Sequence, residues 1–205
     1  MFDRLGVFPA SFDEAAAIAV CGTDGVERWD VIDALASLVA KSMIGLDPAG
    51  DTTRYQLLET LRHFARDHAA DLDGLRRRHA THYAAFAEAA GAGLLSRDEL
   101  RWRPRLAAEL DNLRAAAGWA FDATDLDDVV IGVRMIDALM FEAMMVPSWG
   151  IQTWAAPALA RVDGLEAEQR AGVHAATSHD ALAPHWGGSY VRLRGAVWLI
   201  GGRPA

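Results

Sequence analysis

One stretch of the sequence departs from the helical spacing of apolar residues, and it limits the possible folds more than any other feature. The short apolar run Met43–Leu46 is followed by the turn-forming residues Asp47–Asp51 and then by Thr52–Leu58, which is rich in Thr, Tyr and Leu. Two such runs around a turn that contains Pro and Gly predict the strands of a small β-hairpin. We therefore predict a mainly α protein with one hairpin.

The residues on either side of the hairpin have the spacing of amphipathic helices. Ser11 and Glu14 have the capping-box spacing, which predicts a helix over Phe12–Cys21 with Ser11 as its N-cap. A second helix is predicted from near Asp30, and a third from Glu59, with apolar residues three and four apart in each. The predicted buried faces are Val31, Leu35, Leu38 and Val39 in the second helix, and Leu61, Phe64, Ala65 and His68 in the third. The order helix, helix, hairpin, helix is that of a winged-helix module, which we place at residues 1–72.

The remainder of the chain, residues 75–205, is predicted to be a helical array. The chain has 40 alanines and 19 arginines against one lysine, and alanine and arginine are both strong helix formers. The small residues and aromatics between Ala175 and Ala196 resemble half of a tetratricopeptide repeat, so we expect the array to be TPR-like. The predicted helices are Arg76–Ala90, a stripe ending near Phe121 with a break near Pro104, Val129–Met145, a helix from Ser148, Glu166–Leu182 and Tyr190–Ile200.

The charge of the chain argues against a dedicated nucleic-acid-binding protein. The formal net charge is −8, and residues 1–70 carry 11 acidic and 6 basic side chains, whereas a DNA-binding surface needs basic excess. In many winged helices the third helix enters the major groove, and the helix in that position here, Asp30–Lys41, has only Asp30, Asp33 and Lys41 as charged residues. These charges argue against DNA binding by this helix, so we keep direct DNA binding as the alternative hypothesis and not as the main one.

Two groups of arginines are the candidate contacts for a partner or for nucleic acid. Both lie outside the predicted winged-helix module, and the second surrounds Trp102. The simpler interpretation is a solvated face or one that docks another domain. The candidate residues are Arg76, Arg77, Arg78, Arg101, Arg103 and Arg105.

No motif in the sequence indicates catalysis, a cofactor or a metal. There is no glycine-rich turn followed by Gly-Lys-Ser or Gly-Lys-Thr, so we expect no nucleotide hydrolysis by the phosphate-loop mechanism. His79 and His82 are expected to be solvated on a polar helix face beside the arginines, and Cys21 to be a small core residue. A second histidine cluster between His174 and His185 has poor helical spacing for metal ligands.

Neither a signal peptide nor an apolar run long enough to cross a membrane occurs in the sequence. We therefore expect a cytoplasmic protein that does not bind a membrane.

Five stretches in this order resemble the region that follows the nucleotide-binding domain of signal-transduction ATPases with numerous domains, in particular the large actinobacterial LuxR-type transcriptional regulators. The resemblance covers about residues 1–122, and its stretches begin at Arg4, Leu35, Arg54, Arg78 and Glu109. It implies an ATPase upstream, then a winged helix that packs on the ATPase and does not read DNA, and then helical repeats that sense a ligand or partner. The ATPase and an effector domain are missing here, and residues 123–205 do not match a regular repeat, so the resemblance implies a fragment or a split gene product.

The resemblance, together with the missing phosphate loop, implies a non-catalytic regulatory piece of an ATP-dependent switch in a transcriptional regulator. Its expected partners are another protein or the parent ATPase domain, and it is expected to be able to form homo-oligomers. Three hypotheses compete with it: a DNA-binding winged-helix transcription factor, a hydrolase built on the cluster from His174 to His185, and a plain helical scaffold. The acidic candidate recognition helix argues against the first of these, and the histidine spacing argues against the second.

Overall fold

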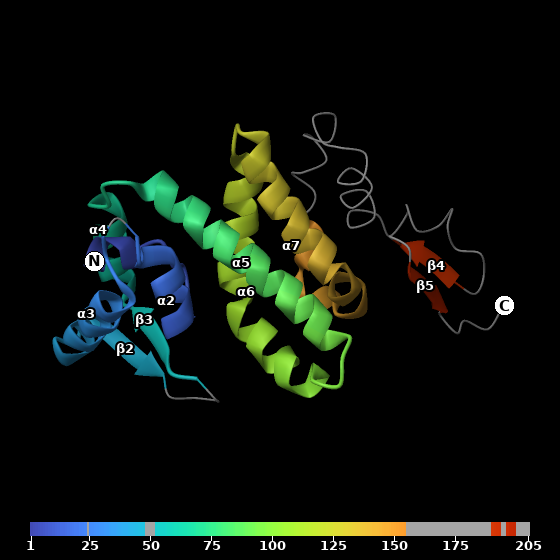
Figure 1. Cartoon of the computed structure of the whole chain (residues 1–205), viewed down its shortest axis with the longest axis horizontal. Helices are drawn as coiled ribbons and strands as arrows, with labels where there is room; N and C mark the ends of the chain where they lie inside the picture. Colours follow the sequence, from blue (N-terminus) through green and yellow to red (C-terminus); the bar gives the residue numbers. More distant parts are fainter. Residues whose placement is uncertain (24, 48–51, 155–189, 194–195, 200–205) are drawn as a thin grey trace.

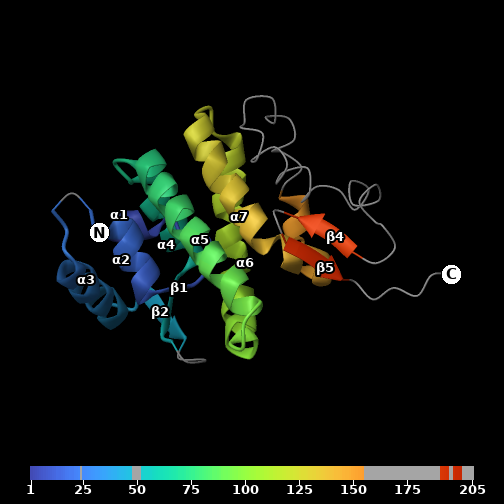
Figure 2. The same cartoon turned by 45° about the vertical axis from the view of Figure 1, so that its right-hand side comes forward.

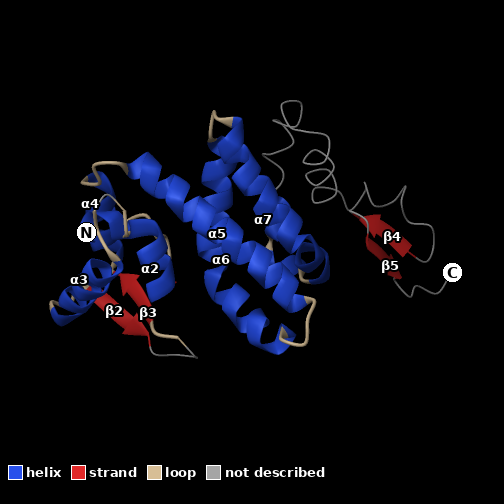
Figure 3. Ribbon diagram, viewed as in Figure 1, coloured by secondary structure: helices blue, strands red, loops and turns tan. Residues whose placement is uncertain are grey.

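The computed structural model describes residues 1–23, 25–47, 52–154, 190–193 and 196–199, and every structural statement below concerns these residues. The N-terminal part combines short helices with a three-stranded sheet, and three long helices packed against one another follow it (Figure 1). Figure 3 shows that helix dominates both parts. The prediction of a mainly α fold that begins with a winged-helix-like module is confirmed.

The N-terminal part has the strand order of a winged helix. Its antiparallel sheet has the order β1–β3–β2, with Phe12 opposite Tyr55 and Ile44 opposite Leu57. The third helix leads directly into the hairpin, and the return strand of the hairpin pairs with the short strand between the first two helices. The elements are α1 (Phe2–Leu5), β1 (Phe12–Asp13), α2 (Glu14–Cys21), α3 (Arg28–Ala40), β2 (Ile44–Asp47), β3 (Arg54–Leu57) and α4 (Glu59–Asp67).

The start of α2 differs from the prediction. Phe12 and Asp13 form β1, and the N-cap of α2 is Asp13, whose Oδ1 accepts a hydrogen bond of 2.8 Å from the Ala16 amide. The predicted N-cap Ser11 was wrong because the Ser11 hydroxyl accepts a hydrogen bond from Arg54 of β3. Because Phe12 and Asp13 pair with β3, the helix starts two residues later than predicted and Asp13 takes the capping position.

Helix α3 follows the prediction, whereas α4 departs from it. A capping box between Glu27 and Asp30 starts α3, and the predicted residues Val31, Leu35 and Leu38 are buried. In α4, Ala65 is fully buried but Phe64 is 53% exposed and stacks on His68, so the predicted buried face of this helix was wrong in part.

Three long helices form the array, with two short 3₁₀ helices after them. The sequence predicted that the first long helix ends at Gly91, but α5 continues through Gly91 and Gly93. At each glycine another part of the array approaches the helix more closely than a side chain would allow. A Cβ on Gly91 would lie 2.2 Å from the Ala138 carbonyl oxygen, and one on Gly93 would lie 2.1 Å from the Trp102 ring. The elements are α5 (Leu72–Leu94), α6 (Glu99–Asp122), α7 (Leu126–Met145), η1 (Pro147–Trp149) and η2 (Ile151–Thr153).

The predicted break near Pro104 was wrong, since α6 continues through this residue. A proline in the second turn of a helix removes one backbone hydrogen bond, and the buried face of α6 compensates for that loss. The predicted stripe on this helix is confirmed for Leu106, Leu113, Ala117 and Phe121, which are all buried.

Two of the helices predicted for the C-terminal part of the chain were wrong. The predicted helix Tyr190–Ile200 was wrong, because β4 (Tyr190–Leu193) and β5 (Ala196–Leu199) pair as antiparallel strands there. The aromatic and β-branched residues of this stretch favour strands over helix. The helix predicted from Ser148 is replaced by η1 and η2. The predicted helix Glu166–Leu182 and the histidine cluster lie outside the described residues, as does most of the TPR-like pattern.

Helix α5 lies between the two parts of the molecule. Figures 1 and 2 both show α2 of the N-terminal part beside α5, and α6 and α7 close to α5 as well. The Nε of Arg78 in α5 donates a hydrogen bond of 3.2 Å to the Val20 carbonyl oxygen in α2. The division into domains 1–72 and 75–205 stays a prediction.

No described helix combines the length and the apolar character that crossing a bilayer requires.

Candidate functional site

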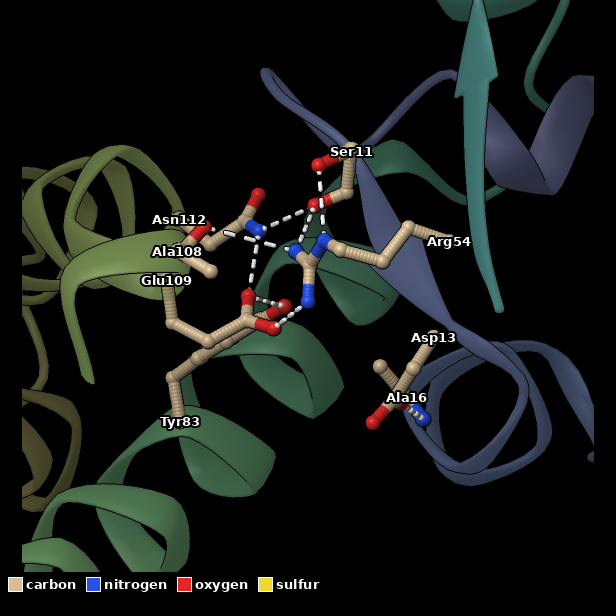
Figure 4. Close-up of polar contacts among 8 residues, drawn as sticks. All are labelled: Ser11, Asp13, Ala16, Arg54, Tyr83, Ala108, Glu109 and Asn112. Atoms are coloured by element: carbon tan, nitrogen blue, oxygen red, sulfur yellow. Dashed lines mark hydrogen bonds and ion pairs between the residues drawn. The ribbon is translucent and has the colours of Figure 1, made fainter. Parts of the chain in front are cut away.

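A buried arginine at the start of β3 joins the winged-helix module to the helical array. Arg54 Nε and Nη2 donate to the Ser11 hydroxyl (2.9 Å) and the Ser11 carbonyl oxygen (2.7 Å), both within the module (Figure 4). Its Nη1 donates to Glu109 Oε1 of α6 at 2.5 Å, and Nη2 also donates to the Ala108 carbonyl oxygen at 3.3 Å. One guanidinium of the hairpin therefore bonds to the residue before β1 and to the array at the same time.

Glu109 collects three donors from three elements. Besides the Arg54 bond, its Oε2 accepts hydrogen bonds from the Tyr83 hydroxyl of α5 (2.9 Å) and from Asn112 Nδ2 (2.8 Å). Asn112 Nδ2 also donates to the Ser11 carbonyl oxygen at 2.8 Å. The side chains of Arg54 and Glu109 are only 12% and 6% exposed. We call Ser11, Arg54, Tyr83, Glu109 and Asn112 the polar junction (Figure 4).

The electrostatics of the polar junction favour the charged form of Arg54 and the neutral form of Tyr83. Burial acts to lower the pKa of Arg54, but the hydrogen bond and the charge of Glu109 outweigh it, so the pKa is raised above its ordinary value. Burial, with the Glu109 charge second, raises the pKa of the Tyr83 hydroxyl well above its usual 10, so this hydroxyl stays a donor. If either residue of this ion pair were removed, the other would keep its charge away from water without a partner, which would destabilise the folded chain.

An aromatic layer lies beneath the polar junction and also crosses the boundary. Phe8 stacks on Phe12 with ring centroids 4.2 Å apart, and it contacts His79 of α5 at 5.3 Å. His79 in turn lies 4.6 Å from the Tyr83 ring. The same interface therefore has a polar layer and an aromatic layer.

His79 is a core residue, and the prediction that it is solvated was wrong. It is 3% exposed, and burial, reinforced by the charge of neighbouring His82, lowers its pKa to about 3. His82 is partly buried and its pKa is lowered as well, mainly by burial. Helical spacing alone places His79 on the polar face of α5, beside the arginines. In the folded chain Phe8 of the N-terminal module covers His79, so it is buried.

The polar junction is held together by contacts among its own side chains. Its charged groups bond to each other, and no group of three or more His, Cys, Asp or Glu side chains among the described residues is placed to hold a metal ion. A cavity of about 290 Å³ lies between β3 and the start of α4, and its charged lining residues, Glu59 and Arg62, are hydrogen-bonded to each other. Cys21 is fully buried, as predicted, and burial raises its pKa to about 12.

The first group of predicted arginines lies in the first turns of α5, where each has a carboxylate partner. Arg76 pairs with Asp73 at 3.1 Å, Arg78 with Asp71 at 3.7 Å, and Arg77 with Asp128 of α7 at 2.8 Å.

The second group of predicted arginines lies at the other end of the α5–α6 hairpin, so the structure does not bring the two groups together (Figure 1). Arg103 is bonded to Glu99 at 2.7 Å and to the buried Glu142 of α7 at 3.1 Å. Arg101 and Arg105 are exposed. Within the part of the chain that the structure describes, Arg103 is the member of this group that links two elements of the array.

No pattern in the sequence predicted that the residues of the polar junction lie together. A signal was present, because Glu109 and Asn112 interrupt the apolar stripe of α6 at positions that face inward with Leu106 and Leu113. Arg54 gave no such signal, since the first residue of a short strand in a hairpin is normally exposed. Two of the stretches that carry the family resemblance begin at Arg54 and Glu109.

Comparison with known proteins places the chain beside transcriptional regulators. It is 32% identical over 151 residues to the "Putative HTH-type transcriptional regulator Rv0890c" of Mycobacterium tuberculosis and, equally, to the "Putative HTH-type transcriptional regulator Mb0914c" of Mycobacterium bovis. No protein-family model and no solved structure matches the chain. The similarity covers 73% of this chain and 16% of each relative. The chain is thus similar, over most of its length, to about a sixth of a much longer HTH-type transcriptional regulator.

Proposed function

We propose that this chain is a non-catalytic regulatory segment of an ATP-dependent transcriptional switch, which relays a change of state between its winged-helix module and its helical array. The polar junction carries this proposal, because Arg54 and Glu109 form a buried ion pair between the two parts. The names of the relatives support a role in transcription regulation. The ATP-dependent switch itself rests on the family resemblance.

A buried ion pair suits such a relay better than it suits stability alone. The cost of removing both charges from water cancels much of their attraction, so the net gain in stability is small, but the geometry is strongly specified. Rotation of the module would separate Arg54 from Glu109 and leave both charges unpaired. The two parts therefore move together or exchange this contact for another, and an element with two such arrangements can transmit a signal.

Hydrogen exchange of the whole chain tests the relay. The variant pair Arg54→Met with Glu109→Gln removes both charges, so the chain should still fold while the module loses its polar bond to α6. We expect amides of β3 and α2 to exchange roughly tenfold faster, which corresponds to about 1.4 kcal/mol, while amides in the middle of α7 stay unchanged.

The matched control for this experiment is a second Arg–acid pair on α6. Arg114 and Asp111 form an exposed ion pair on one helix, so Arg114→Met with Asp111→Asn makes the same chemical change without touching the boundary. This control should leave exchange in the module unchanged. Equal exchange in the module of the first variant and the wild type would contradict the relay.

The non-catalytic part of the proposal is tested separately with nucleotides. Isothermal titration of the purified chain with ATP and with ADP should show no tight binding, because the sequence has no phosphate-binding loop. Turnover of ATP, or binding at micromolar concentration, would contradict the assignment of a regulatory segment that depends on an ATPase elsewhere.

The second candidate function is direct DNA binding, which the winged-helix strand order and the names of the relatives favour. Against it, α3 carries the acidic Asp30 and Asp33, and its one arginine, Arg28, is paired with Glu14 at 3.5 Å, so the helix has no excess of cations for phosphates. Fluorescence anisotropy with a labelled duplex decides between the two. If α3 contacts DNA, the affinity should fall steeply as the salt concentration rises, and binding should be lost in Ser37→Glu. The relay predicts no binding through α3.

A further inference from the structure

Three exposed arginines line one side of α6 and the turn before it. Arg101 and Arg105 are four residues apart, so they share a helix face about 6 Å apart along the axis, and Arg97 lies four residues earlier in the turn. All three are exposed. We call Arg97, Arg101 and Arg105 the arginine face.

Two acidic groups near the arginine face, Glu99 and Glu142, are already engaged. Arg103, which points to the other side, takes Glu99 and the buried Glu142 as its partners. Among the described residues, the side chains of Arg97 and Arg101 form no ion pair or hydrogen bond, and Arg105 contacts only an aromatic ring. Residues 97–105 hold four arginines against Asp98 and Glu99, in a chain whose net charge is −8.

Arg105 is held in place without losing its hydrogen-bond donors. Its guanidinium lies 4.3 Å from the centroid of the Trp102 ring. Trp102 is itself fixed between Gly93, which leaves room for its indole, and Phe86, whose ring centroid is 5.9 Å away. Stacking on a fixed ring orders the guanidinium in advance, so it loses less entropy when it binds an anionic group.

Large apolar side chains beside the arginine face indicate what kind of anionic partner it fits. Leu100, which directly precedes Arg101, is 86% exposed, and Leu95, two residues before Arg97, is 51% exposed. Phosphate-binding surfaces rely on cations and polar groups, whereas protein interfaces combine arginines with apolar residues. The combination therefore favours a protein over a nucleic acid.

We propose that the arginine face, together with Leu95 and Leu100, docks an acidic amphipathic helix of a protein partner. Carboxylates four residues apart on such a helix have the same spacing as Arg101 and Arg105, and arginine binds carboxylates in a bidentate manner. The apolar residues of the partner helix cover Leu100. This inference deepens the proposed function, since it names the chemistry of a partner and rests on the chain being a binding segment.

The test uses the whole chain and defined probes. One probe is a capped 20-residue helical peptide with glutamates at i, i+4 and i+8 beside a row of leucines, and its match has glutamine at each glutamate. We expect the glutamate peptide to bind and the glutamine peptide to bind at least roughly tenfold more weakly at low salt. Arg101→Glu with Arg105→Glu should weaken binding of the glutamate peptide by a similar factor, and Leu100→Ser should weaken it several-fold.

Arg114→Glu is the matched control, because Arg114 lies on the same helix, is exposed and is already paired with Asp111. It should change affinity by less than about twofold. The proposal is overturned if the two peptides bind equally, if Arg114→Glu acts as strongly as the changes at Arg101 and Arg105, or if a 20-base-pair duplex binds through these arginines without any effect of Leu100→Ser. Loss of peptide binding would leave the exchange experiment on the polar junction unaffected, so the two proposals can fail separately.

Discussion

At the scale of single residues, the position of a charge relative to the interface decides its effect. Arg54 and Glu109 are buried and bonded across the boundary, whereas Arg114 and Asp111 are about half exposed on one helix. Coulomb attraction is screened for the exposed pair but not for the buried one, so the two pairs should respond very differently to the same change.

Glu109→Gln should therefore be strongly destabilising. It removes a charge but keeps the size of the side chain, so Arg54 stays buried without its counter-ion, which costs about 3 kcal/mol in the free energy of unfolding. Urea denaturation followed by circular dichroism measures this. Asp111→Asn is the control and should cost less than about 1 kcal/mol. Adding Arg54→Met to Glu109→Gln should recover part of the loss, and no recovery would show that the ion pair is not the cause.

His79 should make the protein less stable in mild acid. Its pKa is about 3 in the folded chain against an ordinary 6.5, so the unfolded chain takes up a proton below pH 6.5 that the folded chain refuses. The free energy of unfolding therefore falls as pH drops from about 6.5 toward 3, by about 1 kcal/mol per pH unit. Above pH 6.5 the stabilising contribution is fully present.

The measurement is urea denaturation at several pH values between 7 and 4.5. His79→Phe keeps an aromatic ring against Phe8 and Tyr83, so the variant should lose this part of the pH dependence. His63→Gln changes an exposed histidine and should keep the wild-type slope. An unchanged slope in His79→Phe would contradict the assignment.

At the scale of elements, the long helices can pack closely only where a side chain is absent. Gly91 of α5 lies against the backbone of α7, where a Cβ would be 2.2 Å from the Ala138 carbonyl oxygen. Gly118 of α6 has nothing within 4 Å of the position of a Cβ. The same substitution should therefore have opposite signs at these two positions.

Gly118→Ala should stabilise the chain by about 0.5–1 kcal/mol, because alanine is the better helix former and nothing obstructs it. Gly91→Ala has the same helical gain, but the clash with the Ala138 backbone forces α5 and α7 apart, and we expect a net loss of about 1–3 kcal/mol. Thermal denaturation of both variants provides the test. A gain in stability for Gly91→Ala would show that the two helices are not closely packed there.

At the scale of the whole molecule, the winged-helix module and the array share one hydrophobic core. Buried residues of α2, α5 and α6 belong to a single cluster that crosses the predicted boundary. Ion pairs then join the helices of the array, including Arg134 with Glu88 and Arg103 with Glu142. The two parts are distinct in architecture but should depend on each other for stability.

We therefore expect residues 1–154 to unfold in one cooperative transition. Urea denaturation can be followed by far-ultraviolet circular dichroism and by the protection of amides in α2 and in α6 from hydrogen exchange. The resulting unfolding curves should coincide. A shortened chain ending at residue 71 should lose most of its stability, because it exposes the buried face of α2 that α5 covers. Two separate transitions would mean that the boundary divides independent folding units.

Local patterns in the sequence were sufficient for most of the helices and for the hairpin. Periods of 3.6 and 2 residues and the turn-forming residues Asp47–Asp51 act within a few residues of themselves. The same local reasoning failed where two elements compete for a residue. Ser11 could cap a helix but bonds to Arg54 instead, and Pro104, which predicted a break, lies inside α6.

The sequence by itself determined the mainly α composition, the winged-helix order and the acidic charge, because these depend on residue type and short-range spacing. Only the tertiary structure decided that His79 is buried, that Arg54 meets Glu109 and that Arg103 is engaged while Arg101 is not. Each of these depends on contacts between residues that lie 39 to 71 positions apart. The environment of a polar side chain is set by whichever distant element covers it, and no local pattern contains that information.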